Sequence, residues 1–232
     1  MMSRQGEVMK PETKSVNAWG MLMTLLASVV SVSAGSIVGI IDWDTPPATG
    51  WISDDAAVAV STTSGSGGDG QWLRIDFDDG DPADVLVSGS AADLFAGTWR
   101  SEYWIEFDFW AETTLPDMLQ VRWGAEGSTN IWGQTVTPSG GVGTWQTLRA
   151  TSLGDDANWD IGLGDPSEYL ADLSSIDWIG VYIDRGTTSG ADSYGVDDYA
   201  LMVPEPAEIM MLAAAFGVGL LVWRRMRLVP VN

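Results

Sequence analysis

The sequence predicts an all-β protein: a two-sheet β-sandwich of the jelly-roll type, with an N-terminal signal helix and a C-terminal transmembrane helix. Three observations lead to this prediction. The central region, residues 35–202, contains runs in which apolar and polar residues alternate with the period of two that strands have. Clusters of Gly, Ser and Asp separate these runs, as turns do. Each end of the chain carries one apolar segment with basic residues beside it.

Residues 1–34 have the order of a secretory signal peptide. Arg4, Lys10 and Lys14 precede an apolar stretch at 18–32, and small residues offer a cleavage site before Gly35. A retained N-terminal anchor is the alternative, but the stretch is shorter than the ~20 residues that usually span a bilayer. We therefore expect the Sec translocon and signal peptidase to be the first partners of the chain.

The strands of the central domain are predicted from alternation. In the longest run, 102–110, the residues Tyr103, Ile105, Phe107 and Phe109 share one face and should point into the core. Similar runs lie at 73–77, 119–123, 179–183 and, less regularly, 194–201, and one helical turn is expected at 167–173. About eight to ten such strands favour a jelly roll. Residues 35–202 would form this single domain and bury about 70% of their unfolded surface.

The domain is strongly acidic and lacks several catalytic residue types. Residues 35–202 carry 28 Asp and Glu against five Arg and no Lys, a net charge of −23, which should repel nucleic acid and anionic lipid. The chain has no His and no Cys, so Ser-His-Asp, Cys-His and His-metal chemistries are excluded within it. We expect no enzyme. Glu106 and Asp108, about 6.6 Å apart along one strand face, leave carboxylate-dependent glycoside hydrolysis as the less favoured alternative.

The domain loosely resembles the galactose-binding-like jelly roll of carbohydrate-binding modules. The resemblance rests on the segments 145–148 and 176–183, and on 194–199 as the closing strand. It implies that the outer face of one sheet, or the loops at its end, holds sugar. It also implies a structural calcium ion that ties the first strand to the last.

The candidate sugar site follows from the alternation of two neighbouring strands. If these strands pair, the residues opposite their core faces place indole rings, carboxylates and a guanidinium on one surface, a mixture that suits the C–H faces and hydroxyls of an extracellular polysaccharide. These residues are Trp104, Glu106, Asp108, Trp110, Gln120 and Arg122. The alternative is that the two tryptophans are covered by a loop or pack against their neighbours.

The candidate calcium site combines aspartates from the two ends of the domain. Calcium binds six to eight oxygen ligands, so two carboxylates from the first strand and two from the last, with backbone carbonyls, would form a site if these strands meet. The residues are Asp42, Asp44, Asp197 and Asp198. Exposed aspartates at strand ends are the alternative.

The last thirty residues predict the destination of the protein. An extended, proline-containing stretch precedes residues 207–223, which as a helix would reach about 25 Å, slightly less than the ~30 Å hydrocarbon core of a bilayer. Arg224, Arg225 and Arg227 then hold that end in the cytoplasm. The prediction is a transmembrane helix with the domain outside the cytosol, and an ordinary single-pass anchor would have the same features.

This tail resembles the PEP-CTERM sorting signal of Gram-negative bacteria that make exopolysaccharide. The resemblance rests on Val203, Pro204, Glu205 and Pro206, on the apolar segment and on the arginines, whereas residues 228–232 extend beyond the family pattern. In that family a membrane-embedded exosortase recognises the signal and cleaves near the tripeptide. The resemblance implies a sorting signal at 203–232, an exosortase-type partner and a protein anchored by its C-terminal helix before it reaches the cell surface or extracellular space.

Together these features predict an exported cell-surface or extracellular-matrix protein with a carbohydrate-binding sandwich. A purely structural component of the envelope or biofilm matrix is the alternative, because a β-sandwich with a sorting tail serves either role.

Overall fold

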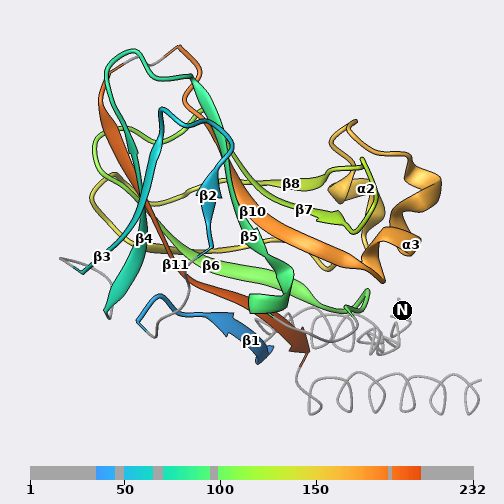
Figure 1. Cartoon of the computed structure of the whole chain (residues 1–232). Coiled ribbons are helices and arrows are strands. Elements are labelled where there is room, and N and C mark those ends of the chain that lie inside the picture. Colours follow the sequence, from blue (N-terminus) through green and yellow to red (C-terminus); the bar gives the residue numbers. More distant parts are fainter. Residues whose placement is uncertain (1–34, 45–49, 65–69, 95–98, 188–189, 205–232) are drawn as a thin grey trace, which may run out of the picture. The chain divides into compact units, whose positions relative to one another are not determined.

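The computed structural model describes residues 35–44, 50–64, 70–94, 99–187 and 190–204. The described residues form two antiparallel β-sheets with short helices at one end (Figure 1). The predicted all-β, two-sheet sandwich is therefore confirmed.

Sheet A contains both ends of the domain. Its order is β3-β4-β11-β6-β9, with β1 also paired to β11. The strands are β1 (Gly35–Ile41), β3 (Ala59–Ser64), β4 (Gln71–Phe77), β6 (Trp104–Ala111), β9 (Gln146–Arg149) and β11 (Asp192–Pro204). Along one edge, β11 pairs first with β4 and then with β1, while β6 follows its other edge. A bulge between Asp197 and Ala200 interrupts the β6 pairing, and Asp198 within it has a positive φ of 48°.

Sheet B has the order β2-β5-β10-β7-β8. Its strands are β2 (Ile52–Ser53), β5 (Asp84–Ser90), β7 (Met118–Ala125), β8 (Trp132–Val136) and β10 (Ile176–Asp184). The short helices are η1 (Ala91–Asp93), α2 (Asp156–Trp159), η2 (Pro166–Glu168) and α3 (Tyr169–Leu173). η2 and α3 occupy the helical turn predicted at 167–173. α2 is a single turn, too short for a helical period to reveal it in the sequence.

The core between the sheets is aromatic. Tyr103, Ile105, Phe107 and Phe109 are buried in it, as the alternation predicts. Phe107 stacks on Tyr199 with ring centroids 5.5 Å apart. Offset stacks of this kind add stability beyond the burial of the rings themselves. The inward-facing residues of every long strand are buried in this core. Any ligand would therefore be held by outward-facing residues of the strands or by the loops.

The two ends of the domain meet in the β1–β11 pair. Gly35 lies opposite Pro204, and Ser36 opposite Val203. β11 thus runs two residues beyond the predicted domain end at 202 and includes the first half of the Val-Pro-Glu-Pro stretch. Glu205, Pro206, Arg224, Arg225 and Arg227 lie outside the described residues, as do the signal segment 1–34 and the predicted transmembrane segment. None of the helices in the described part of the chain is long and apolar enough to cross a bilayer.

Candidate functional site

The predicted sugar surface is divided between the two outer faces of the sandwich. β6 belongs to sheet A and β7 to sheet B, so the two strands do not pair and the condition for one shared surface is not met. The chain crosses from one sheet to the other between them, and alternation alone does not reveal a crossover. We call the outward surface of sheet A face A and that of sheet B face B. Face A carries Trp104, Glu106, Asp108 and Trp110, whereas face B carries Gln120 and Arg122.

Trp104 is not available to a ligand. It is 2% exposed and forms a small apolar cluster with Ala200 and Met202 on the outer side of sheet A. The guanidinium of Arg149 lies over its ring, 3.9 Å from the centroid. Gly35 packs so closely that a Cβ there would come within 2.4 Å of Trp104 Cζ2. For this residue the alternative, packing against neighbours, is correct.

Trp110 belongs to a cluster of three tryptophans, which we call the Trp cluster: Trp72, Trp110 and Trp145. Trp72 comes from β4, and Trp145 immediately precedes β9. Trp72 lies 5.6 Å from Trp110 and 5.5 Å from Trp145, while Trp110 and Trp145 stack at 6.4 Å. The rings lie over Gly195, where a Cβ would come within 2.8 Å of Trp145 and 3.0 Å of Trp72. Trp72 is 5% exposed, but Trp110 and Trp145 remain part-exposed.

Glu106 and Asp108 line a pocket of about 200 Å³ on face A. The rest of its lining comes from β1, β6, β9 and β11: Ile37, Ile40, Phe107, Thr147, Asp198, Ala200 and Met202. The lining therefore combines apolar side chains with three carboxylates. Asp197, next to this pocket, is only 7% exposed. Burial raises its pKa to about 7, and the nearby carboxylates of Asp198, Asp108 and Asp42 act in the same direction, against the N–H of Asp198, which donates to it at 2.9 Å.

The four aspartates of the predicted calcium site are only partly brought together. The first and last strands do pair, but β1 ends at Ile41, so Asp42 and Asp44 follow the strand. Asp42 accepts the N–H of Asp44 at 2.7 Å, and Asp44 accepts the N–H of Gln71. Across the described ranges, no three acidic side chains lie close enough together to hold a metal ion. The calcium site stays a prediction from the sequence.

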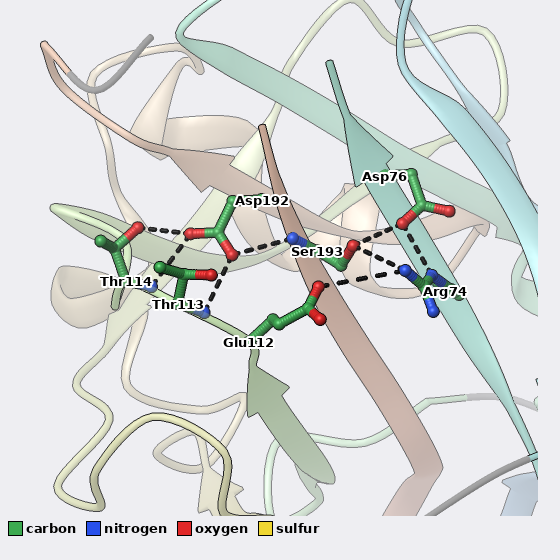
Figure 2. A network of polar contacts seen from close by, with 7 residues as sticks. All are labelled: Arg74, Asp76, Glu112, Thr113, Thr114, Asp192 and Ser193. Atoms are coloured by element: carbon green, nitrogen blue, oxygen red, sulfur yellow. Dashed lines mark hydrogen bonds and ion pairs between the residues drawn. The ribbon is translucent and has the colours of Figure 1, made fainter. Parts of the chain in front are cut away.

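A polar network joins β4, the start of β11 and the segment that follows β6 (Figure 2). Arg74 of β4 donates to Asp76 at 2.7 Å and to Ser193 at 3.0 Å, and lies 4.0 Å from Glu112. Asp192 is 5% exposed, and it binds the backbone of the loop that follows β6. Its carboxylate accepts the N–H groups of Thr113 and Thr114, each at 3.0 Å, and that of Ser193 at 2.9 Å. The network therefore fixes the Arg74 guanidinium in place.

Face B is organised around Arg122. Its guanidinium carbon lies 3.6 Å from the ring centroid of Tyr182 on β10, and its Nε donates to Gln120 at 2.9 Å. The hydroxyl of Tyr182 donates to Asp84 at 2.8 Å. Burial lowers the pKa of Arg122, while Tyr182, Asp54 and Asp84 oppose that change. Since the stack and the Nε bond fix the guanidinium, its terminal Nη groups are held above the sheet in a defined orientation.

Trp178 extends the aromatic surface of face B. It lies four residues before Tyr182 on the same side of β10, about 13 Å along the strand. Its indole packs over Gly124, where a Cβ would come within 2.3 Å of Trp178 Nε1. Trp178, Tyr182 and Arg122 are all part-exposed. The rings of Trp178 and Tyr182 on β10 and the guanidinium of Arg122 on β7 therefore all face outward on face B.

Sequence reasoning missed Tyr182, Trp178, Trp72, Trp145 and Arg74, although a signal for most of them was present. Tyr182 and Trp178 alternate with the buried residues of 179–183, and Trp72 and Arg74 alternate with those of 73–77. The missing information was which outward residues of different strands lie on the same face. That depends on strand order, which periodicity does not contain.

Several solved structures resemble the fold of this chain at low sequence identity. The solution structure of CtCBM11 has a TM-score of 0.52 at 18% identity and covers 76% of this chain and 99% of that one. A family 11 carbohydrate-binding module from Clostridium thermocellum, in complex with a β-1,3-1,4-mixed-linked tetrasaccharide, has a TM-score of 0.48 at 18% identity, covering 72% and 95%. An exo-β-agarase has a TM-score of 0.48 at 12% identity, covering 73% of this chain but 25% of the enzyme.

At these identities the likeness to CtCBM11 establishes the β-sandwich fold. No protein-family model matches the sequence, and no curated relative does either.

Proposed function

We propose that the protein is a non-catalytic carbohydrate-binding domain that binds a polysaccharide chain across face B. The observation that carries this proposal is the fixed guanidinium of Arg122, stacked on Tyr182 and bonded through Nε to Gln120. Its terminal Nη groups are placed to donate to sugar hydroxyls, and the indole of Trp178 offers a surface for the C–H face of a neighbouring sugar. The fold shared with CtCBM11 supports this reading.

The charge of the domain narrows the class of ligand. With 28 acidic residues and five arginines at 35–202, the domain repels an anionic polymer. Asp54 and Asp84, both close enough to Arg122 to affect its pKa, offer acceptors for sugar hydroxyls. The ligand is therefore a neutral polysaccharide rather than a uronate or sulfated one.

Affinity electrophoresis of the full-length protein tests the proposal. Gels containing mixed-linkage β-1,3-1,4-glucan, xylan or agarose should retard it, whereas polygalacturonate should not. Arg122→Ala and Tyr182→Ala should each weaken retention about tenfold, since each removes part of the stack. Arg100→Ala is the matched control, because it removes the same charge from a side chain that is 65% exposed, in the segment that leads into β6 of sheet A.

Two outcomes would contradict the proposal. Retention that is unchanged in Arg122→Ala and Tyr182→Ala would exclude face B as the site. Passage of the protein through every gel without retardation would favour the alternative, a purely structural component of the envelope or biofilm matrix.

We also propose that the protein is exported and sorted by an exosortase-type system, on the strength of the resemblance at 203–232. Cell fractionation with an antibody against the domain tests this part separately. The domain should be found at the cell surface or in the medium, and Arg224→Ala with Arg225→Ala should change its distribution. Full-length protein in the cytoplasmic fraction would overturn the assignment.

A further inference from the structure

We infer that the domain has a second carbohydrate-binding surface on face A, built from the Trp cluster and Arg74, so that one chain can cross-link two polysaccharide strands. This inference rests on the proposed binding at face B, and its ligand is of the same class, a neutral polysaccharide. The two surfaces lie on opposite sides of the sandwich, because they belong to the outer faces of different sheets.

The three indole rings of this surface are held in defined positions by their packing. Three strands or loops remote in sequence contribute Trp72, Trp110 and Trp145, and Gly195 leaves the space that their rings fill. Trp145 is the last residue of the loop before β9, and this loop is held by Gln146 of β9, whose Oε1 accepts the N–H groups of Ser139 and Gly140, each at 2.8 Å. Trp110 and Trp145 are part-exposed, while Trp72 supports them from below.

A fixed polar group lies beside these rings. Residue pairing places Gly195 opposite Arg74 on one side and opposite Trp110 on the other, so the guanidinium and the indole flank the same glycine. Figure 2 shows Arg74 held by Asp76 and Ser193 and facing Glu112. The side chains of Arg74, Asp76 and Glu112 are 37%, 35% and 51% exposed. Donors and acceptors are thus accessible next to aromatic rings, the combination that sugar binding requires.

Two opposed binding faces allow the domain to do what a single face does not allow. A domain with one binding face decorates a polysaccharide, whereas a domain with two opposed faces joins two strands, and multivalent attachment strengthens retention in a matrix. Face A therefore links carbohydrate binding to a structural role outside the cell.

Isothermal titration of the full-length protein with a soluble oligosaccharide of whichever polysaccharide retards it tests the inference. The wild type should bind two oligosaccharides per chain. The double variant Trp110→Ala, Trp145→Ala should bind one, and Arg122→Ala with Tyr182→Ala should also bind one. Val142→Ala, at a residue 45% exposed in the loop before Trp145, is the matched control and should bind two.

A second measurement covers the case in which the tryptophan variant does not fold. Arg74→Ala leaves the Trp cluster in place and should weaken one of the two sites severalfold. Light scattering of the long polysaccharide should rise when wild-type protein is added, but not with either single-face variant. A stoichiometry of one that face B variants abolish would overturn the second surface and leave the proposed function standing. Absence of all binding would instead overturn the proposed function.

Discussion

Face A and face B use similar residues in different ways. On face A, indole rings pack against one another over Gly195, and the carboxylates of Asp198, Asp108 and Asp42 add to the raised pKa of Asp197 at the bulge in β11. On face B, a guanidinium lies on a tyrosine ring and carboxylates flank it. Face A therefore combines aromatic packing with a carboxyl group of raised pKa, whereas face B is organised around one guanidinium. An outward tryptophan thus says little about binding until its neighbours on the same face are known.

The largest difference expected between the faces is in their response to pH. The pKa of Asp197 is raised to about 7 in the folded protein, above its value near 4 in the unfolded chain. The folded state therefore binds the proton more tightly, and this contribution is complete below pH 4 and lost as the pH rises through 7. The difference between these two pKa values corresponds to at most about 4 kcal/mol. Thermal unfolding in EDTA should show a Tm that falls from pH 5 to pH 8.

The variant Asp197→Asn isolates this effect from the general charge repulsion of an acidic protein. Its Tm should depend less on pH than that of the wild type and should exceed it at pH 8, whereas Asp177→Asn, at an exposed residue on β10, should behave as the wild type. Added calcium sharpens the test, because a bound cation favours the carboxylate form. A Tm that calcium does not alter at pH 8 would count against the predicted calcium site.

A somewhat smaller effect is expected from Asp192, which holds the loop at the edge of face A. Asp192→Ala leaves the N–H groups of Thr113 and Thr114 without their acceptor and should lower the free energy of unfolding by about 3 kcal/mol. Urea unfolding measures this loss. The binding of polysaccharide at face B should be retained, and a parallel loss of both would show that the two faces are not independent.

The smallest effect separates the ring of Tyr182 from its hydroxyl. Tyr182→Phe keeps the surface under Arg122 but removes the hydrogen bond to Asp84, at a cost in stability of about 1 kcal/mol. Retention in polysaccharide gels should fall less than in Tyr182→Ala. Equal losses in the two variants would assign the role of Tyr182 to its hydroxyl rather than to the stack.

The sequence predicted each strand better than it predicted the relations between strands. The alternation around Phe107 identified a buried face, because the period of two is a property of a single strand and can be recognised in its sequence alone. Trp104 and Trp110 have the same period and the same residue type, yet one is covered by Arg149 and Met202 and the other is part-exposed. Arg149 and Met202, which cover Trp104, are distant from it in the sequence. Arg122 was singled out correctly as outward, but its partner Tyr182 is on β10, and only strand order brings the two together.

The position of β11 constrains when the domain can fold. It is the last strand in sequence, yet it lies in the interior of sheet A and pairs with β1, β4 and β6. A chain that emerges from its N-terminus first therefore lacks the central element of this sheet until residues 192–204 are available. Completion of sheet A is a late event, governed by contacts of long sequence separation, which form slowly. The sandwich therefore cannot close before the last strand of the domain has been added.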